Sequence, residues 1–99
     1  MNNQIEKRLV RSMLDFLELK LIDQGQNYGY ALLKAFKKKF GVNLAMSQVY
    51  PALYQLEEIG YVKGQWDLSD KPKKVYSITP QGKAYLTKFE QAKSLLNSL

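Results

Sequence analysis

The sequence predicts one mainly α-helical domain with a small β-hairpin, and three observations support this. A chain of 99 residues can bury one modest core but is short for two independent domains. In four stretches, apolar residues recur at intervals of three and four, which is the period of an amphipathic helix. Two short runs rich in β-branched and aromatic residues, 61–66 and 74–78, flank a polar segment with turn residues, which is typical of a hairpin.

The composition favours an anionic partner and argues against catalysis. The formal net charge is +6, and no acidic residue lies between Asp23 and Glu57. That interval holds four lysines, Lys34, Lys37, Lys38 and Lys39. A basic chain attracts nucleic acid or membrane surfaces. The chain has neither Cys nor His, which excludes thiolate zinc sites, cysteine nucleophiles and imidazole bases. No catalytic residue, metal site or cofactor is therefore expected.

The sequence also gives an expectation about where the protein works. Its first residues do not resemble a signal peptide, and no apolar run is long enough to cross a bilayer. The absence of Cys is compatible with a reducing compartment. We expect a cytoplasmic protein that does not enter a membrane.

The first half of the chain predicts two helices. Helical spacing of apolar residues indicates one uninterrupted helix from Gln4 to about Gln24. A second helix is expected from about Tyr28 to Phe40, and Gly41 should end it and open a short turn. The lysines of this helix lie on its outer side, and the residues expected to face inward are Tyr30, Leu33, Phe36 and Phe40.

The third helix carries an unusual polar face. Its apolar stripe is expected to be Val49, Ala52, Leu53, Leu56 and Ile59. The opposite face has amide and phenol groups and no charge before Glu57; its members are Gln48, Tyr54 and Gln55, with Tyr50 at the edge. Such groups both give and accept hydrogen bonds, as reading base edges requires. Ser47 can cap this helix, although Ala45 or Asn43 could also mark its start, and Gly60 is suited to end it.

The hairpin follows at once. Lys71, Lys73 and Lys74 surround its tip, where they could follow a phosphate backbone or simply protect an exposed strand edge. Trp66 is expected to be packed apolar bulk behind the core rather than a platform for a ligand. Three helices with a tight turn, followed by this strand pair, are the pattern of a winged helix-turn-helix, which we assign to residues 1–80.

The last helix, residues 81–99, is expected to pair two copies of the chain while packing on the same domain. Thr79 and Pro80 give it a capping hydroxyl and a proline in the first turn. Its apolar stripe has coiled-coil spacing: Tyr85, Phe89, Ala92, Leu96 and Leu99. The domain could cover Tyr85, but the segment from Phe89 onward is expected to extend too far to fold back. A second copy, with Leu9 also at the interface, would cover it.

Three motifs in register resemble the PadR family of transcriptional regulators. They are Tyr28-Gly29-Tyr30 with Leu33, the run Val49-Tyr50-Pro51-Ala52-Leu53 followed by Leu56-Glu57 and Gly60-Tyr61-Val62, and Val75-Tyr76-Ser77-Ile78-Thr79-Pro80-Gln81-Gly82. The resemblance extends from about Leu14 to Leu86. One departure is Ala45, which stands where the family often has a capping Ser and so weakens the helix start or moves the cap to Ser47.

The resemblance implies a homodimeric DNA-binding regulator, commonly a repressor, that places its third helix in a major groove. Some members release DNA on binding a small hydrophobic or aromatic effector. For this chain we expect a near-palindromic operator in double-stranded DNA, with half-sites one helical turn apart. The residues assigned to DNA are Lys34, Lys38, Ser47, Gln48, Tyr50, Tyr54, Gln55, Lys71, Lys73 and Lys74. Gln48 and Gln55 are candidates for adenine, Tyr54 for a thymine methyl or phosphate, and Tyr50 and the lysines for the backbone.

One alternative remains open from the residues alone. The same winged helix could serve protein assembly, with its lysines only keeping the surface soluble. Steep loss of duplex affinity with salt would distinguish a DNA binder from such a module.

Overall fold

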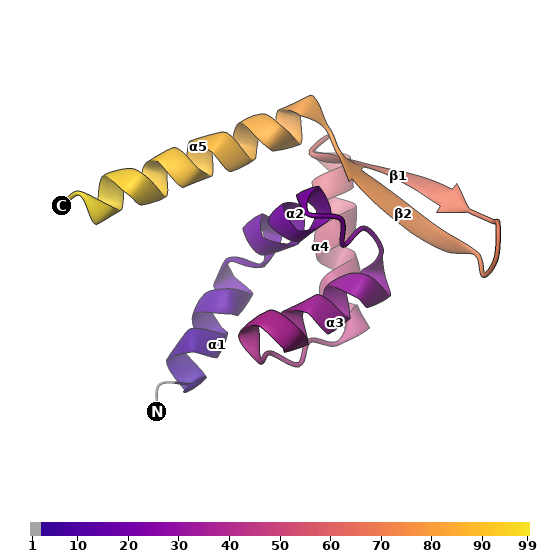
Figure 1. Cartoon of the computed structure of the whole chain (residues 1–99), viewed down its shortest axis with the longest axis horizontal. Coiled ribbons are helices and arrows are strands. Elements are labelled where there is room, and N and C mark those ends of the chain that lie inside the picture. Colours follow the sequence, from indigo (N-terminus) through magenta and orange to yellow (C-terminus); the bar gives the residue numbers. More distant parts are fainter. Residues whose placement is uncertain (1–2) are drawn as a thin grey trace.

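Within residues 3–99, five helices and one hairpin make up the fold (Figure 1). The computed structural model describes residues 3–99, with the side chains of α1 described at positions 4, 5 and 8–10. In chain order the elements are α1 (Asn3–Ser12), α2 (Leu14–Asp23), α3 (Gly29–Phe40), α4 (Met46–Glu58), β1 (Val62–Asp67), β2 (Lys73–Ile78) and α5 (Pro80–Asn97). The mainly helical fold with one hairpin is thus confirmed.

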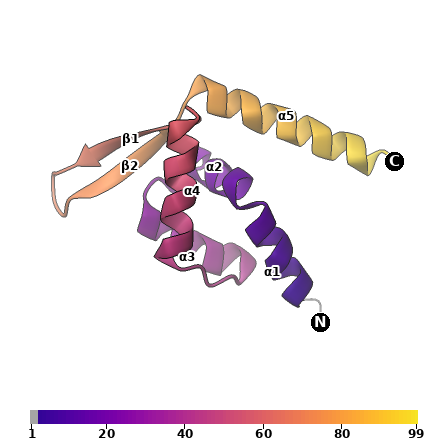
Figure 2. The ribbon, with the colours of Figure 1, turned by 180° about the vertical axis from the view of Figure 1, so that it is seen from behind.

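The core lies where α2, α3 and α4 meet the base of the hairpin. Leu19, Leu32, Phe36 and Leu53 are fully buried there, and Val62 closes the core from β1. From this body α5 and the hairpin project in different directions (Figures 1 and 2), which gives a long, thin molecule of 48 × 32 × 19 Å. No helix within residues 3–99 combines the length and apolarity needed to cross a membrane.

The first predicted helix is two helices. Met13 leaves the α-helical conformation, with φ −106° and ψ 20°, so α1 ends at Ser12 and α2 begins at Leu14. The backbone stays nearly continuous, because Met13 N–H still donates to Leu9 O at 3.0 Å. Past this point the chain enters the core with Phe16 and Leu19, whereas α1 runs away from it (Figure 1). The expectation of one unbroken helix was wrong, and neither Pro nor Gly marks the bend.

Helix α3 has the predicted bounds but a different inner face. Phe36 is buried as expected, and Leu32 and Ala35 join it in the core. Tyr30 is 54% exposed and Phe40 is also exposed, so the prediction that they face inward was wrong. Gly41 ends the helix with φ +66°, the left-handed conformation expected of a glycine cap.

Helix α4 starts at Met46, with Ala45 rather than Ser47 or Asn43 at the capping position. Alanine has no side-chain acceptor, and Gln48 compensates: its Oε1 accepts from Ala45 N–H at 3.0 Å. The buried face is the predicted stripe without its last member, because Ile59 is 51% exposed. Gly60 follows the helix with φ +87°, as the sequence predicted.

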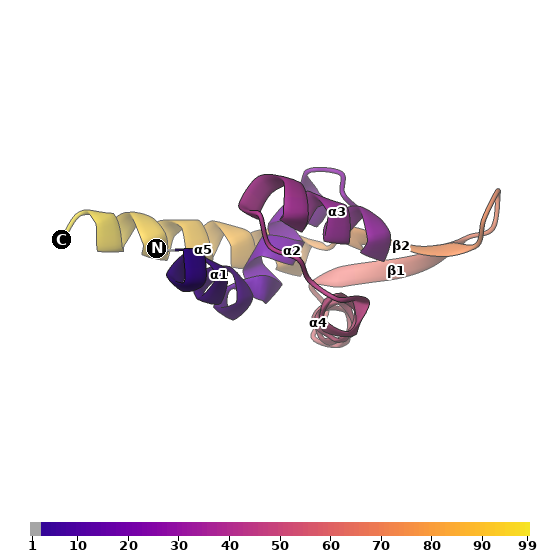
Figure 3. The same cartoon turned by 90° about the horizontal axis from the view of Figure 1, so that it is seen from below.

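The hairpin pairs β1 with β2 in antiparallel register, from Val62 opposite Ile78 to Asp67 opposite Lys73. Trp66 is 65% exposed, so its assignment to the core was wrong. The hairpin extends beyond the helices that would have covered the indole (Figure 3). Tyr76, on the neighbouring strand and nearer the body, is buried instead.

Helix α5 is joined to the body at its first turns. Thr79 Oγ1 accepts from Gly82 N–H at 3.1 Å and donates to Gly60 O at 2.6 Å, which confirms the predicted cap. Tyr85 stacks on Tyr61, and Phe89 stacks on Phe16 with ring centroids 3.9 Å apart. Phe89 therefore does fold back, contrary to expectation. The residues after Glu90 are exposed.

Candidate nucleic-acid interface

The exposed side of α4 divides into an outward face and a flank. Successive helical residues are about 100° apart. Ser47 and Tyr54 therefore project opposite the buried stripe, and both are exposed. Gln48 and Gln55 lie on the flank turned toward α2 and α5, where they border a cavity of about 540 Å³ with Phe16, among other residues. The predicted single face of Gln48, Tyr54 and Gln55 is thus two neighbouring surfaces, although none of the three is buried in the core.

A second cavity of about 300 Å³ lies where α3, α4 and the hairpin meet, and we call it the wing cavity. Its lining is aromatic and basic: Tyr28, Gly29, Tyr30, Tyr50, Asp70, Lys71, Lys73 and Lys74. Gly29 makes the close approach possible, since a β-carbon there would lie 2.7 Å from the Tyr50 ring. Tyr50 also stacks on Tyr54, with ring centroids 6.0 Å apart. The wing cavity thus joins the outward face of α4 to the hairpin.

Two lysines are held near this cavity by aromatic rings. Lys73 Nζ lies 4.8 Å from the Tyr28 ring centroid, and Lys34 Nζ lies 5.2 Å from that of Tyr30. An ammonium group above a ring is attracted to the negative face of the π system. Lys73 lines the wing cavity itself, whereas Lys34 lines a separate cavity along α3 that shares Tyr28 with it.

Lys74 has another partner. Its Nζ lies 2.9 Å from Glu57 Oε1, and Glu57 Oε2 accepts from Gly64 N–H at 3.3 Å. Lys74 lies on β2, within the predicted strand 74–78, and its charge is paired with Glu57. Gly64 leaves room for the arrangement, because a β-carbon there would lie 2.5 Å from Lys74 Cε.

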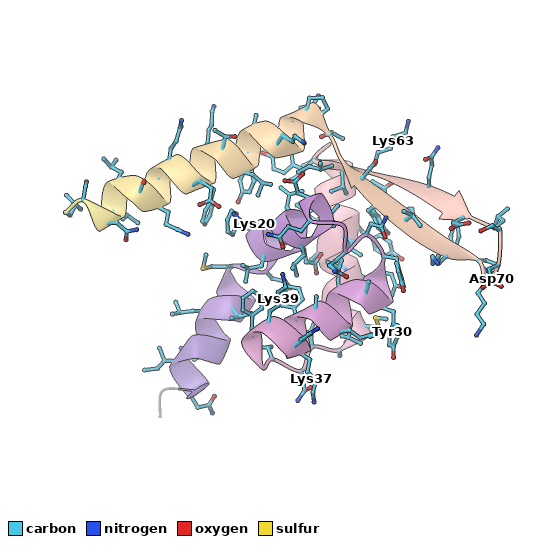
Figure 4. All side chains as sticks on the ribbon, viewed as in Figure 1. Lys20, Tyr30, Lys37, Lys39, Lys63 and Asp70 are labelled. Atoms are coloured by element: carbon cyan, nitrogen blue, oxygen red, sulfur yellow. The ribbon has the colours of Figure 1, made fainter. Side chains whose placement is uncertain are left out.

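The hairpin tip carries the remaining charges. Lys71 is exposed there, next to Asp70, which Figure 4 shows at the far end of the hairpin. Asp67 Oδ1 accepts from both Ser69 Oγ and Ser69 N–H, at 2.6 and 3.0 Å, which holds the pKa of Asp67 below its usual value.

Lys38 lies one helical turn beyond Lys34. Both border a separate cavity with Gln26 and Tyr28. Lys37 and Lys39 are exposed on the same helix (Figure 4), and Lys39 donates to Gln24 Oε1 at 3.3 Å. Of the lysines assigned to DNA, Lys71, Lys73 and Lys74 thus line the wing cavity, and Lys34 and Lys38 line the separate one.

Two residues of the interface were not assigned from the sequence. Tyr28 and Tyr30 were read as the entry to a helix, with Tyr30 facing inward. Both line the wing cavity. The signal that could have found them is Gly29 between them, because a glycine inside a helix often marks close approach of another group.

Taken together, the three-helix core, the projecting hairpin and the basic aromatic surface between them define a winged helix-turn-helix protein. The sequence model of the Transcriptional regulator PadR-like family matches residues 19–88. The chain therefore belongs to the PadR-like family, whose members are transcriptional regulators and not enzymes.

Solved structures agree with this assignment. A PadR family transcriptional regulator from Eggerthella lenta shares 31% identity and a TM-score of 0.75, over 92% of this chain and 77% of that one. PadR from Bacillus subtilis, solved in complex with operator DNA, shares 29% identity and a TM-score of 0.69, over 77% of this chain and 45% of that one. A PadR-like transcription factor from Bacteroides fragilis, at 20% identity, shares the fold, with a TM-score of 0.80 over 96% of this chain and 93% of its own. No curated protein sequence gives a significant match.

Proposed function

We propose that this chain binds double-stranded DNA with sequence preference, as a homodimer, and represses transcription by occupying a near-palindromic operator. The observation that carries the proposal is the wing cavity, in which α3, α4 and the hairpin bring lysines and tyrosines to one surface. The Bacillus subtilis relative, solved in complex with operator DNA, supports the same proposal.

Helix α4 would enter the major groove with Ser47 and Tyr54 foremost. Gln48 and Gln55 would read base edges from the flank, and Tyr50 with Lys34, Lys71 and Lys73 would hold phosphates. Gln48 has one constraint, since its Oε1 already accepts from Ala45 N–H. A contact to adenine must use the remaining lone pair and the amide N–H groups.

A salt titration of a labelled duplex tests the DNA proposal. We expect Lys73→Ala to weaken all sequences alike and to lower the slope of log K against log salt by about 0.9, the value for one phosphate contact. Lys88→Ala removes the same charge from an exposed position of α5 and is the matched control. Equal changes in the salt slope for Lys73→Ala and Lys88→Ala would contradict the assignment of Lys73 to a phosphate contact. Weak, salt-insensitive binding by the unmodified chain would favour the assembly module instead.

Base reading needs its own test. Gln55→Ala should cost about 1–3 kcal/mol at one base position and leave other positions unchanged. Gln48→Ala should show the same selectivity with some loss of helix stability, because the cap to Ala45 is removed. Binding measured against a panel of single-base variants separates these outcomes. If both substitutions lowered the affinity for all duplex variants equally, the proposal that Gln48 and Gln55 contact base edges would be refuted.

The dimer is proposed from the exposed apolar end of α5. Leu95 and Leu96 are each 68% exposed, and Leu99 is almost fully exposed. Ala92 is exposed between them and the domain. Ile5 and Leu9 of α1 present further exposed apolar surface. Pairing these helices around a two-fold axis would remove that surface from water.

Sedimentation at several concentrations tests the dimer. The double variant Leu95→Ser/Leu96→Ser should sediment as a monomer, whereas Leu68→Ser, at an equally exposed leucine on the hairpin, should remain dimeric. A dimer that resists the double variant would place the interface elsewhere. Tyr85 and Phe89 stack within their own chain, so their part in the interface is limited to their exposed edges.

A small hydrophobic or aromatic effector stays a prediction. The cavity of about 540 Å³ that borders Gln48 and Gln55 also has Phe16, Tyr85 and Phe89 in its lining. A ligand there would touch α4 directly. Displacement of bound duplex by an aromatic probe, tested with and without Phe89→Ala, would check this site.

A further inference from the structure

Trp66 and Leu68 form an exposed apolar pair on the hairpin. Trp66 is the only tryptophan of the chain, and its side chain is 65% exposed. Leu68, two residues farther along, is 71% exposed. Single apolar residues on a surface are ordinary, whereas an exposed indole followed two residues later by an exposed leucine, on a projecting element, is a candidate interaction site.

The pairing of the strands places Trp66 on the side of α4. Trp66 lies opposite Lys74 in the hairpin, and residues directly opposite each other share a face of the sheet. Lys74 reaches α4 from that face, since its Nζ contacts Glu57 and lies 5.8 Å from the Tyr54 ring centroid. The other face carries Lys63, which Figure 4 shows pointing away from the helical body. The indole is therefore on the α4 side of the hairpin.

The lysines beside the indole favour an anionic partner. Trp66 lies opposite Lys74, which lines the wing cavity together with Lys71 and Lys73. Asp67 is an ionised acid, because the hydrogen bonds from Ser69 lower its pKa, but it lies opposite Lys73 on the other face of the sheet from Trp66. An apolar group beside ammonium groups suits a partner whose surface alternates phosphates with apolar sugars.

We propose that Trp66, supported by Leu68, is the apolar DNA contact of the hairpin. This rests on the function proposed above. With α4 in a major groove, the indole would pack on the deoxyribose wall and base edges of the adjacent minor groove, while the lysines of the wing cavity neutralise nearby phosphates. The contact adds affinity without adding charge, so it should not change the dependence on salt.

The sole tryptophan makes the contact directly observable. The intrinsic emission of Trp66 should change on addition of an operator-containing duplex, and the indole should become protected from acrylamide. Trp66→Ala should lower duplex affinity about ten-fold, as loss of a large aromatic contact does, with an unchanged salt slope. Trp66→Phe should recover part of the loss. Gln65→Ala, on the opposite face of β1, is the control and should bind as the unmodified chain does.

The outcomes separate this inference from the function on which it rests. If anisotropy shows salt-dependent duplex binding while Trp66 emission, acrylamide access and Trp66→Ala affinity are unaltered, the inference is overturned and the proposed function stands. If the indole becomes protected with rising protein concentration and no DNA, its partner is a second copy, which also overturns the inference. If no duplex binds, both proposals fail together.

Discussion

Glu18 lies on α2 with its side chain wholly buried in the core. Neither carboxyl oxygen has a hydrogen-bond partner among the described residues. Burial, and then the nearby charge of Asp15, raise the pKa of Glu18 from 4.5 to about 9. Because a buried, unpaired carboxylate is strongly disfavoured, Glu18 is protonated in the folded chain at neutral pH and ionised in the unfolded chain.

The dependence of stability on pH follows from this difference. Between the unfolded pKa of 4.5 and the folded pKa of about 9, the folded state holds one proton that the unfolded state has released. The free energy of unfolding should therefore fall with rising pH in this window, by about 1.4 kcal/mol per unit. From pH 6 to pH 8 the Glu18 contribution is a loss of about 3 kcal/mol. Below pH 4.5 none of this stability is lost.

Glu18→Gln tests the reasoning because an amide does not titrate. Urea unfolding of both proteins at pH 6 and pH 8, at one protein concentration, gives the required comparison. The unmodified chain should lose about 3 kcal/mol more than Glu18→Gln over this interval. Glu58→Gln, at an exposed glutamate of α4, should keep the full pH dependence. Parallel losses in the unmodified chain and Glu18→Gln would show that Glu18 titrates normally, and the reasoning would be refuted.

Three further substitutions test close contacts, each by chemical denaturation. Gly29→Ala should displace the Tyr50 ring, which would lie 2.7 Å from the new methyl group, and cost about 1 kcal/mol; no loss would mean the ring shifts freely. Tyr76→Phe should stabilise the fold by about 1 kcal/mol, since the buried hydroxyl has no partner among the described residues; a loss would reveal one. Thr79→Ala should cost about 1–2 kcal/mol through the lost cap to Gly82, with Thr79→Ser as the control that retains it.

The elements of this fold were predictable because each has a local signal. Each signal lies within a few residues of the feature that it determines. These signals are the cap at Thr79, the glycines at the ends of α3 and α4, and the alternating pattern of the two strands. The bend at Met13 has no such signal. It arises because the first turn of α2 enters the core with Phe16, whereas α1 touches the core at Val10, near its end. The contact of Phe16 with Phe89 depends on residues distant in sequence.

The candidate site was predictable in kind but not in arrangement. A polar, uncharged helix beside lysines could be recognised from residue types alone. Which side of α4 carries Tyr54, and which carries Gln55, depends on how that helix is turned against α2 and the hairpin. Trp66 was misplaced because a strand pattern does not show how far a hairpin extends beyond its core.

Glu57 fixes the position of the hairpin relative to α4. Its two oxygens connect α4 to both strands, through Lys74 on β2 and the Gly64 amide on β1. Helix α4 and the hairpin are thereby held at a fixed spacing. If the chain binds DNA as proposed, a duplex whose local twist or groove width does not match the spacing between α4 and the hairpin must deform to be bound. Selectivity would then extend to base pairs that no side chain touches.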